Sequence, residues 1–258
     1  MIFIIPIIIS IFMAVISLVG SITKAAISAF VTLRSDRVKR LSESEILVAK
    51  YRDPLLLATA DLQSHLHNIY QRRLLSDYHQ NRSKKDYVDF WTPYVVGQYF
   101  SWVYILRRQV QFSQFSTDKN NKKLSDALDA IQKSFSTDYY TLSDLDEALF
   151  MLWRGQQMAI GEIMTVTEGE ELFCMRYSAF SSNYKSDTFQ RWFEPISEGI
   201  TRLVDEHSHP NHLPGNRLRR VQHRLLELMD ILDPSYLGPA TMRGPVDAAP
   251  GCGCVRCR

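Results

Sequence analysis

The chain has 258 residues, of which 45% are apolar and 22% charged, and its formal net charge is +2. A charge so close to neutral, with no stripe of Lys and Arg interleaved with aromatic residues, argues against a nucleic-acid-binding protein. Three of the four cysteines fall in the last seven residues, so they cannot cross-link a core as disulfides do in small secreted domains.

Residues 1–23 are predicted to form a transmembrane anchor. They carry no charged side chain, and most of them are Ile, Val, Leu, Phe, Met or Ala. A helix of about 20 such residues crosses the ~30 Å hydrocarbon core of a bilayer. A cleaved signal peptide would begin with basic residues and have a shorter apolar core. A helix buried in a soluble protein would usually show a polar face. The sequence fits the anchor better than either alternative.

Residues 24–45 form a basic juxtamembrane segment, which either extends the anchor helix along the lipid headgroups or is a solvated linker. Its excess of Lys and Arg predicts a single-pass protein with the N-terminus outside and the rest in the cytosol. Asn81-Arg82-Ser83 fits a glycosylation acceptor and favours the opposite orientation, but such triplets often arise by chance.

Residues 46–233 are predicted to form one mainly helical domain. Asp53 and Pro54 suit the start of a first helix, which apolar spacing extends to about Asp77. After a polar link at 81–85, Thr92-Pro93 suits the start of a second helix. A third helix is indicated by one apolar stripe, formed by Leu124, Leu128, Ile131 and Phe135.

The stretch 90–106 carries no charge and is crowded with aromatic residues. Its length of about 17 residues is at the lower limit for a bilayer span. Its aromatic residues are scattered and not grouped at two interfaces, as they are in membrane spans. We therefore predict the central helix of the core, with a second span as the alternative.

The following segments are less uniform. Ser143 or Asp144 is predicted to cap a helix that ends near Gly155. Residues 158–166 and 172–180 suit a small β-hairpin, and continuation of the preceding helix to Met164 is an equal alternative.

Two more helices are predicted at 188–204 and 216–232, with Pro195 bending the first of them or marking a fresh start. Residues 234–258 are rich in Pro and Gly and poor in apolar side chains, so they are predicted to form a disordered, Cys-containing tail.

Arg154, Gln156, Gln157 and Glu162 form the candidate pocket. Arg154 and Glu162 are a potential ion pair in an apolar setting, and a junction between a helix and a strand could turn them toward a polar cavity. Glu162 alone supplies no acid–base pair, so we expect a satisfied polar cluster rather than an active site and assign no catalytic residue.

Two further groups of residues carry side chains of the types that bind metals. His207, His209 and His212 match no familiar zinc spacing. Cys252, Cys254 and Cys257 provide three thiols, whereas structural zinc requires four ligands. The tail cysteines therefore have no role, accept S-acylation or, as the last choice, bind a metal. No metal or other cofactor is assigned.

Several short motifs in residues 48 to 235 occur together: Tyr51-Arg52-Asp53-Pro54-Leu55-Leu56, Asp61-Leu62-Gln63-Ser64, Gly97-Gln98-Tyr99, Arg107-Arg108-Gln109-Val110-Gln111-Phe112, Arg154-Gly155-Gln156-Gln157 and Ala159-Ile160-Gly161-Glu162-Ile163-Met164. In these motifs the chain resembles a family of uncharacterised proteins found in fungi and some other organisms. That family has no assigned activity, so the resemblance implies no catalytic residue and supports only a single domain.

The sequence thus predicts a mainly α protein, with a transmembrane helix followed by a helical-bundle-like domain. We expect it to act by binding, as a scaffold, adaptor or sensor. Its expected partners are the lipid bilayer and an unknown protein, and not nucleic acid. The alternative is a membrane-bound enzyme with a polar pocket around Arg154 and Glu162.

Overall fold

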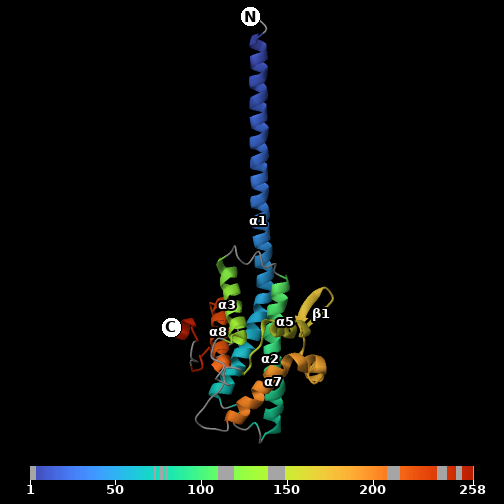
Figure 1. Ribbon diagram of the computed structural model, residues 1–258, viewed down its shortest axis with the longest axis vertical. Coiled ribbons are helices and arrows are strands. Elements are labelled where there is room, and N and C mark those ends of the chain that lie inside the picture. Colours follow the sequence, from blue (N-terminus) through green and yellow to red (C-terminus); the bar gives the residue numbers. More distant parts are fainter. Residues whose placement is uncertain are drawn as a thin grey trace. The chain divides into compact units, whose positions relative to one another are not determined.

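The computed structural model is mainly helical, with a small two-stranded sheet (Figure 1). It describes residues 4–72, 74–75, 78, 81–109, 119–138, 149–207, 216–236, 243–247 and 252–257, apart from the side chains of 4–12, 14–16, 19, 26, 37, 40–45, 47–48, 119–120 and 206–207. The chain divides into two compact units, Met1–Ile46 and Leu47–Arg258.

Helix α1 runs from Ile4 to Gln71 without a break at Pro54. The predicted helix start at Asp53 and Pro54 is therefore wrong. A proline inside a helix costs about 3 kcal/mol because it removes one hydrogen bond and crowds the preceding turn. Leu55, Leu62 and Leu66, which follow the proline, are almost fully buried, and this packing can offset that cost.

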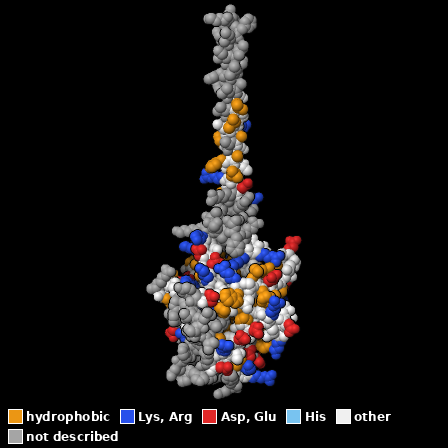
Figure 2. All heavy atoms as spheres, in the orientation of Figure 1, with side chains coloured by type: hydrophobic (Ala, Val, Ile, Leu, Met, Phe, Trp, Pro, Cys, Tyr) orange, Lys and Arg blue, Asp and Glu red, His pale blue; other side chains and the backbone are white. Residues whose placement is uncertain are grey.

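The first unit exposes many apolar side chains, some of which are visible in Figure 2. Large hydrophobic residues there are between 58% and 69% exposed: Met13, Leu18, Ile22, Ile27, Phe30, Val31, Leu33, Val38 and Ile46. As far as the helices are described, none has both the length and the apolar content needed to span a bilayer.

The core of the second unit is built on α2, which spans Arg82–Gln109. Asn81 starts this helix, since its Oδ1 accepts a hydrogen bond from the backbone N–H of Lys84 at 3.2 Å. Pro93 lies inside the helix, so the predicted start at Thr92-Pro93 is wrong. Val95, Tyr99 and Ile105 are buried in the shared core, which confirms a core helix at 90–106.

Three other predicted helices are confirmed: α3 (Lys119–Ser136), α7 (Asp187–His207) and α8 (Asn216–Leu232). The α3 stripe is buried as expected, and α3 packs along α8 (Figure 1). Pro195 lies within α7 and does not begin a new helix.

The predicted helix ending near Gly155 is wrong in its described part, since residues 149–153 are not helical. Phe150 has a positive φ of 57°, and its ring packs so closely on Gly199 that a Cβ there would lie 2.8 Å from it. Leu149, Phe150 and Leu152 are buried in this irregular segment. Their apolar side chains resemble the stripe of a buried helix in the sequence, and the helix prediction was wrong for this reason.

Helix α5 spans Arg154–Ile163 and leads into an antiparallel hairpin of β1 (Thr165–Glu168) and β2 (Glu171–Cys174). Both alternatives for this segment are partly right, because a helix reaches Ile163 and a short hairpin follows it, but this helix begins at Arg154 and does not continue an earlier one. Helix α6 (Tyr177–Asn183) follows the hairpin, so the last part of the predicted strand region 172–180 is helical. α5 packs on α2 at Gly161, where an added Cβ would lie 2.7 Å from the Phe100 carbonyl oxygen.

The tail after Pro234 differs from the predicted disorder wherever it is described. Val246, Cys252 and Cys254 are buried, and a short 3-10 helix, η2, spans Val255–Cys257. Arg243 forms ion pairs with Asp230 and Asp233, near the end of α8. A few buried side chains and ion pairs thus hold a segment whose composition alone suggested that it could not pack.

Candidate functional site

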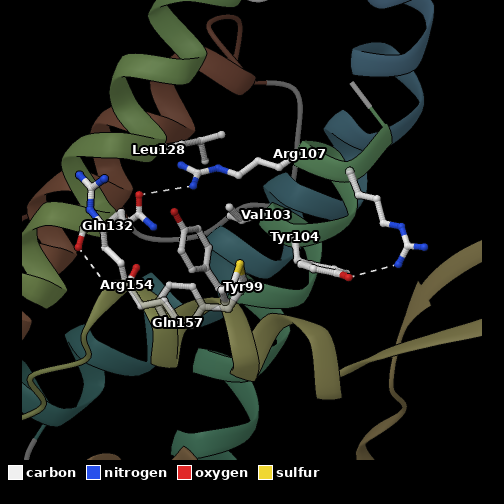
Figure 3. Close-up of a pocket in the computed structure, with 12 residues that line it drawn as sticks. Tyr99, Val103, Tyr104, Arg107, Leu128, Gln132, Arg154 and Gln157 are labelled. Atoms are coloured by element: carbon white, nitrogen blue, oxygen red, sulfur yellow. Dashed lines mark hydrogen bonds between the residues drawn. The ribbon is translucent and has the colours of Figure 1, made fainter. Parts of the chain in front are cut away.

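A pocket of about 450 Å³ lies among α2, α3 and α5 (Figure 3). Binding sites for small molecules in proteins commonly have volumes of 300–1,000 Å³. The lining is largely apolar, and Figure 3 shows that its labelled side chains come from three helices: Tyr99, Val103, Tyr104 and Arg107 from α2, Leu128 and Gln132 from α3, and Arg154 and Gln157 from α5.

Three arginines add positive charge to this apolar lining: Arg107, Arg108 and Arg154. Arg107 is partly neutralised, because its Nη2 lies 2.8 Å from Oδ1 of Asp129. Arg108 donates one hydrogen bond to the Tyr104 hydroxyl, at 3.2 Å. A guanidinium has five N–H donors, so this bond, which is the one that Arg108 makes within the described residues, leaves most of its hydrogen-bonding capacity. Arg154 and Arg108 are exposed and can meet an anion from solvent.

Gln157 is a buried polar side chain of the lining and is only 3% exposed. Its Nε2 donates to the backbone carbonyls of Gln132, at 3.0 Å, and Leu152, at 2.8 Å. These bonds fix the amide, and its Oε1 is buried with no hydrogen-bond donor among the described residues. A buried acceptor in this state is uncommon, and in a pocket lining it suits a donor on a ligand.

Tyr99 contributes a second polar group. Burial raises the pKa of its hydroxyl far above the ordinary value, and nearby Arg107 counteracts this only in part. The hydroxyl therefore stays protonated at neutral pH and is a hydrogen-bond donor rather than a general base.

The predicted pocket residues separate in the structure. Arg154 and Gln157 line the pocket, but Glu162 does not. Arg154 and Glu162 are eight residues apart in α5, which corresponds to a rise of about 12 Å and is too far for the predicted ion pair. Gln156 has a structural role, since its Oε1 accepts a hydrogen bond from the Trp153 N–H, at 2.8 Å, at the start of α5.

Sequence reasoning missed the α2 and α3 contribution to the pocket. Arg107 and Arg108 were noted only as part of a motif, and Leu128 only as part of a helix stripe. The pairing of helices that brings them to Arg154 has no local pattern in the sequence, so only the fold could reveal it.

The tail cysteines come together with His223, a residue that no sequence pattern singles out. Nδ1 of His223, in α8, lies 3.5 Å from Sγ of Cys252, 3.3 Å from Sγ of Cys254 and 3.1 Å from Sγ of Cys257. All four ligand atoms lie within 4.8 Å of one another, and all three cysteines are free thiols. These are the residues of the described chain best placed to hold a metal ion.

The other candidate ligands are less informative. His209 and His212 lie outside the described residues, as does the side chain of His207. Burial of Cys252 and Cys254 argues against S-acylation of those two thiols, and it leaves Cys257 exposed. Desolvation and the neighbouring Cys254 and Cys252 thiols raise the pKa of Cys257 to about 12.

Comparisons of the chain with family models, with curated proteins and with solved structures found no match. The resemblance to the fungal family therefore stays a prediction.

Proposed function

We propose that this protein is a membrane-anchored binding protein whose helical domain takes up an anionic amphiphile, such as a fatty carboxylate. One observation carries the proposal: the pocket among α2, α3 and α5 combines an apolar lining with the guanidinium groups of Arg107, Arg108 and Arg154. Apolar contacts would hold the hydrocarbon part, and the arginines would bind the anionic head.

The chemistry of the head group follows from the arginines. A planar guanidinium pairs with carboxylate or phosphate oxygens through two parallel hydrogen bonds, which makes such pairs strong and directional. Arg107 already forms an ion pair with Asp129, so Arg108 and Arg154 are the main candidates to bind the anionic head group. The Gln157 Oε1 favours a ligand that also carries a hydroxyl or amide donor.

Membrane attachment is the second part of the proposal. The uncharged residues 1–23 would span the bilayer, and the basic segment 24–45 would lie on its cytosolic side. The exposed apolar side chains of the first unit support this, because water does not solvate such a surface favourably. The helical domain would then bind its ligand in the cytosol and pass the bound state to a protein partner, as a sensor or scaffold does.

Ligand binding is tested with the full chain in lipid vesicles, by calorimetric titration with decanoate and with decanol as the uncharged probe. Decanoate is expected to bind at least tenfold more tightly than decanol, because only the carboxylate can pair with the arginines. Arg154→Ala combined with Arg108→Ala should remove this preference. Arg202→Ala is the matched control, since it removes an exposed arginine of α7 that does not line the pocket.

A second variant tests the apolar part of the site. Met158 lines the pocket and is 61% exposed, so Met158→Trp can fill the cavity without disturbing the core. Met158→Trp should lower the affinity for decanoate and for decanol to a similar extent. Equal binding of decanoate by the wild type and the double arginine variant would refute the proposed site.

Attachment is tested by washing membranes at alkaline pH and collecting them by centrifugation. The full chain should remain with the pellet, and a chain that lacks residues 1–23 should be released. Protease added to sealed microsomes should digest the helical domain, whereas a glycan on Asn81 would show that the orientation is reversed.

A further inference from the structure

We infer that His223, Cys252, Cys254 and Cys257 form a structural zinc site that fastens the C-terminal segment to α8. The four donors come from two places in the chain, one in the middle of α8 and three in the last described segment, and the fold brings them within 4.8 Å of one another. Three thiolates and one imidazole are a common ligand set for structural zinc.

The distances fit one tetrahedral ion. Zinc–sulfur bonds of about 2.3 Å and zinc–nitrogen bonds of about 2.0 Å place sulfur and nitrogen about 3.5 Å apart and two sulfurs about 3.8 Å apart. The observed separations between His223 Nδ1 and the three sulfurs are 3.1–3.5 Å. Small shifts of the side chains are therefore enough to place zinc among them.

The hydrogen bond on the far side of the imidazole favours a metal ligand. His223 Nε2 lies 2.7 Å from the backbone carbonyl oxygen of Val246, which can only accept, so Nε2 carries the proton. Nδ1 then presents its lone pair to the three sulfurs. The Nδ1 lone pair can accept a hydrogen bond from only one of the three thiols. A cation, in contrast, can bind the nitrogen and all three sulfurs at the same time. Metal-binding histidines are commonly oriented by a carbonyl in this way.

The backbone conformation around the three cysteines helps to bring their thiols together. Gly253 has φ +45°, a conformation that other residues rarely adopt, and it turns the chain between Cys252 and Cys254. The backbone N–H of Val255 donates to Oε1 of Glu227 at 2.7 Å, which holds the following turn on α8. Both features position the thiols independently of any contact among them.

Charge around the cluster is also suitable. Three thiolates and one Zn²⁺ give a net charge of −1, and Arg224 lies one residue after His223 in α8. Its Nη2 donates to the Cys252 carbonyl oxygen at 3.4 Å. With four protein ligands the ion has no open position, so its role is structural and not catalytic. It would cross-link the tail to α8, as a disulfide does in secreted domains.

The site is tested on the full chain, purified in detergent without chelators from cells grown with added zinc. Mass spectrometry of the metal content should find about one zinc per chain. After zinc removal, titration with Co²⁺ should produce the thiolate-to-cobalt charge-transfer band and the intense d–d bands of tetrahedral cobalt. Added Zn²⁺ should abolish both.

Two variants and a control define the ligands. His223→Gln and Cys254→Ser should each weaken zinc binding at least tenfold and reduce the charge-transfer band or shift the d–d bands. Cys174→Ser should behave like the wild type, because Cys174 lies in β2 and is not part of the cluster. If a ligand variant does not fold, the cobalt spectrum of the wild type decides by itself.

Four results would overturn the zinc site: a wild-type chain that holds no zinc, a cobalt spectrum without thiolate bands, a copper or iron ion in zinc's place, or a disulfide among Cys252, Cys254 and Cys257 in the native protein. A cobalt spectrum unchanged by Cys254→Ser would exclude that cysteine and the proposed ligand set with it.

Discussion

Arg217 offers the sharpest test of how the helical domain is held together. It lies in the first turn of α8 and is only 1% exposed. Its guanidinium donates to the backbone carbonyls of Ser134, Phe135 and Thr137, at 2.9–3.0 Å, at the C-terminal end of α3, and to the carbonyl of Leu149, at 3.1 Å. One side chain thus connects α8, α3 and the irregular segment before α5.

The expected cost of removing it follows from these four bonds. The last carbonyls of a helix have no partner in the helix itself, and their partial negative charge favours a cation. Arg217→Met keeps the apolar stem and removes all four donors. At about 1 kcal/mol per hydrogen bond, the free energy of unfolding should fall by ~4 kcal/mol. The variant no longer pays the desolvation penalty of burying a guanidinium, which lowers the expected loss to about 3 kcal/mol.

Urea unfolding of the full chain in lipid vesicles, followed by tryptophan fluorescence, measures this loss. All four tryptophans lie in the second unit, so the signal reports its unfolding. Arg217→Lys keeps the charge but loses the planar fork, so it should cost about 2 kcal/mol. Arg202→Met, an exposed control, should stay within about 0.5 kcal/mol of the wild type. A loss below about 1 kcal/mol for Arg217→Met would refute the reasoning.

Three further outcomes are expected. Burial lowers the pKa of His65 to about 3. Because the unfolded chain takes up this proton near pH 6.5 and the folded chain does not, stability should fall by about 2.3 kcal/mol from pH 6.5 to pH 4.5, and His65→Gln should reduce this slope in urea unfolding. Gly161→Ala should cost about 2 kcal/mol in the same assay, since its Cβ would meet the Phe100 carbonyl. Glu162→Gln should leave decanoate binding unchanged in calorimetry, because Glu162 does not line the pocket.

Each of these has a matched comparison. An unchanged pH slope in His65→Gln would contradict its burial as a neutral imidazole bonded to Thr92 at 2.8 Å. Gly155→Ala should be neutral or slightly stabilising, as no atom of the described residues lies within 4 Å of a Cβ at Gly155. A tenfold loss of decanoate affinity in Glu162→Gln would show that the Glu162 carboxylate does contribute to the binding site.

Helices with a regular apolar stripe were predictable, and helix starts were not. The spacing of Leu124, Leu128, Ile131 and Phe135 predicted α3, because a period of 3.6 residues is a local property. Pro54 and Pro93 looked like first-turn prolines and lie inside long helices. Whether a proline begins a helix or is accommodated within one depends on how the turns before it pack, and this is not local information.

The candidate sites show the same division. Arg154 and Gln157 were found because they share one short segment, whereas Arg107 and Arg108 reach the same pocket through the packing of α2 on α5. The three tail cysteines were visible from their spacing, but His223 was hidden among the apolar residues of the α8 stripe. A zinc site with three visible ligands therefore seemed incomplete.

By itself, the sequence determined the helical class of the protein, the uncharged opening stretch and the chemistry of the tail cysteines, because composition and periodicity act over a few turns of chain. Only the tertiary structure decided which side chains share a pocket, which histidine joins the cysteines and which carbonyls Arg217 caps. The contacts of His223 and Arg217 alone join residues between 29 and 83 positions apart. Such pairings depend on how whole helices pack, and no local pattern records them.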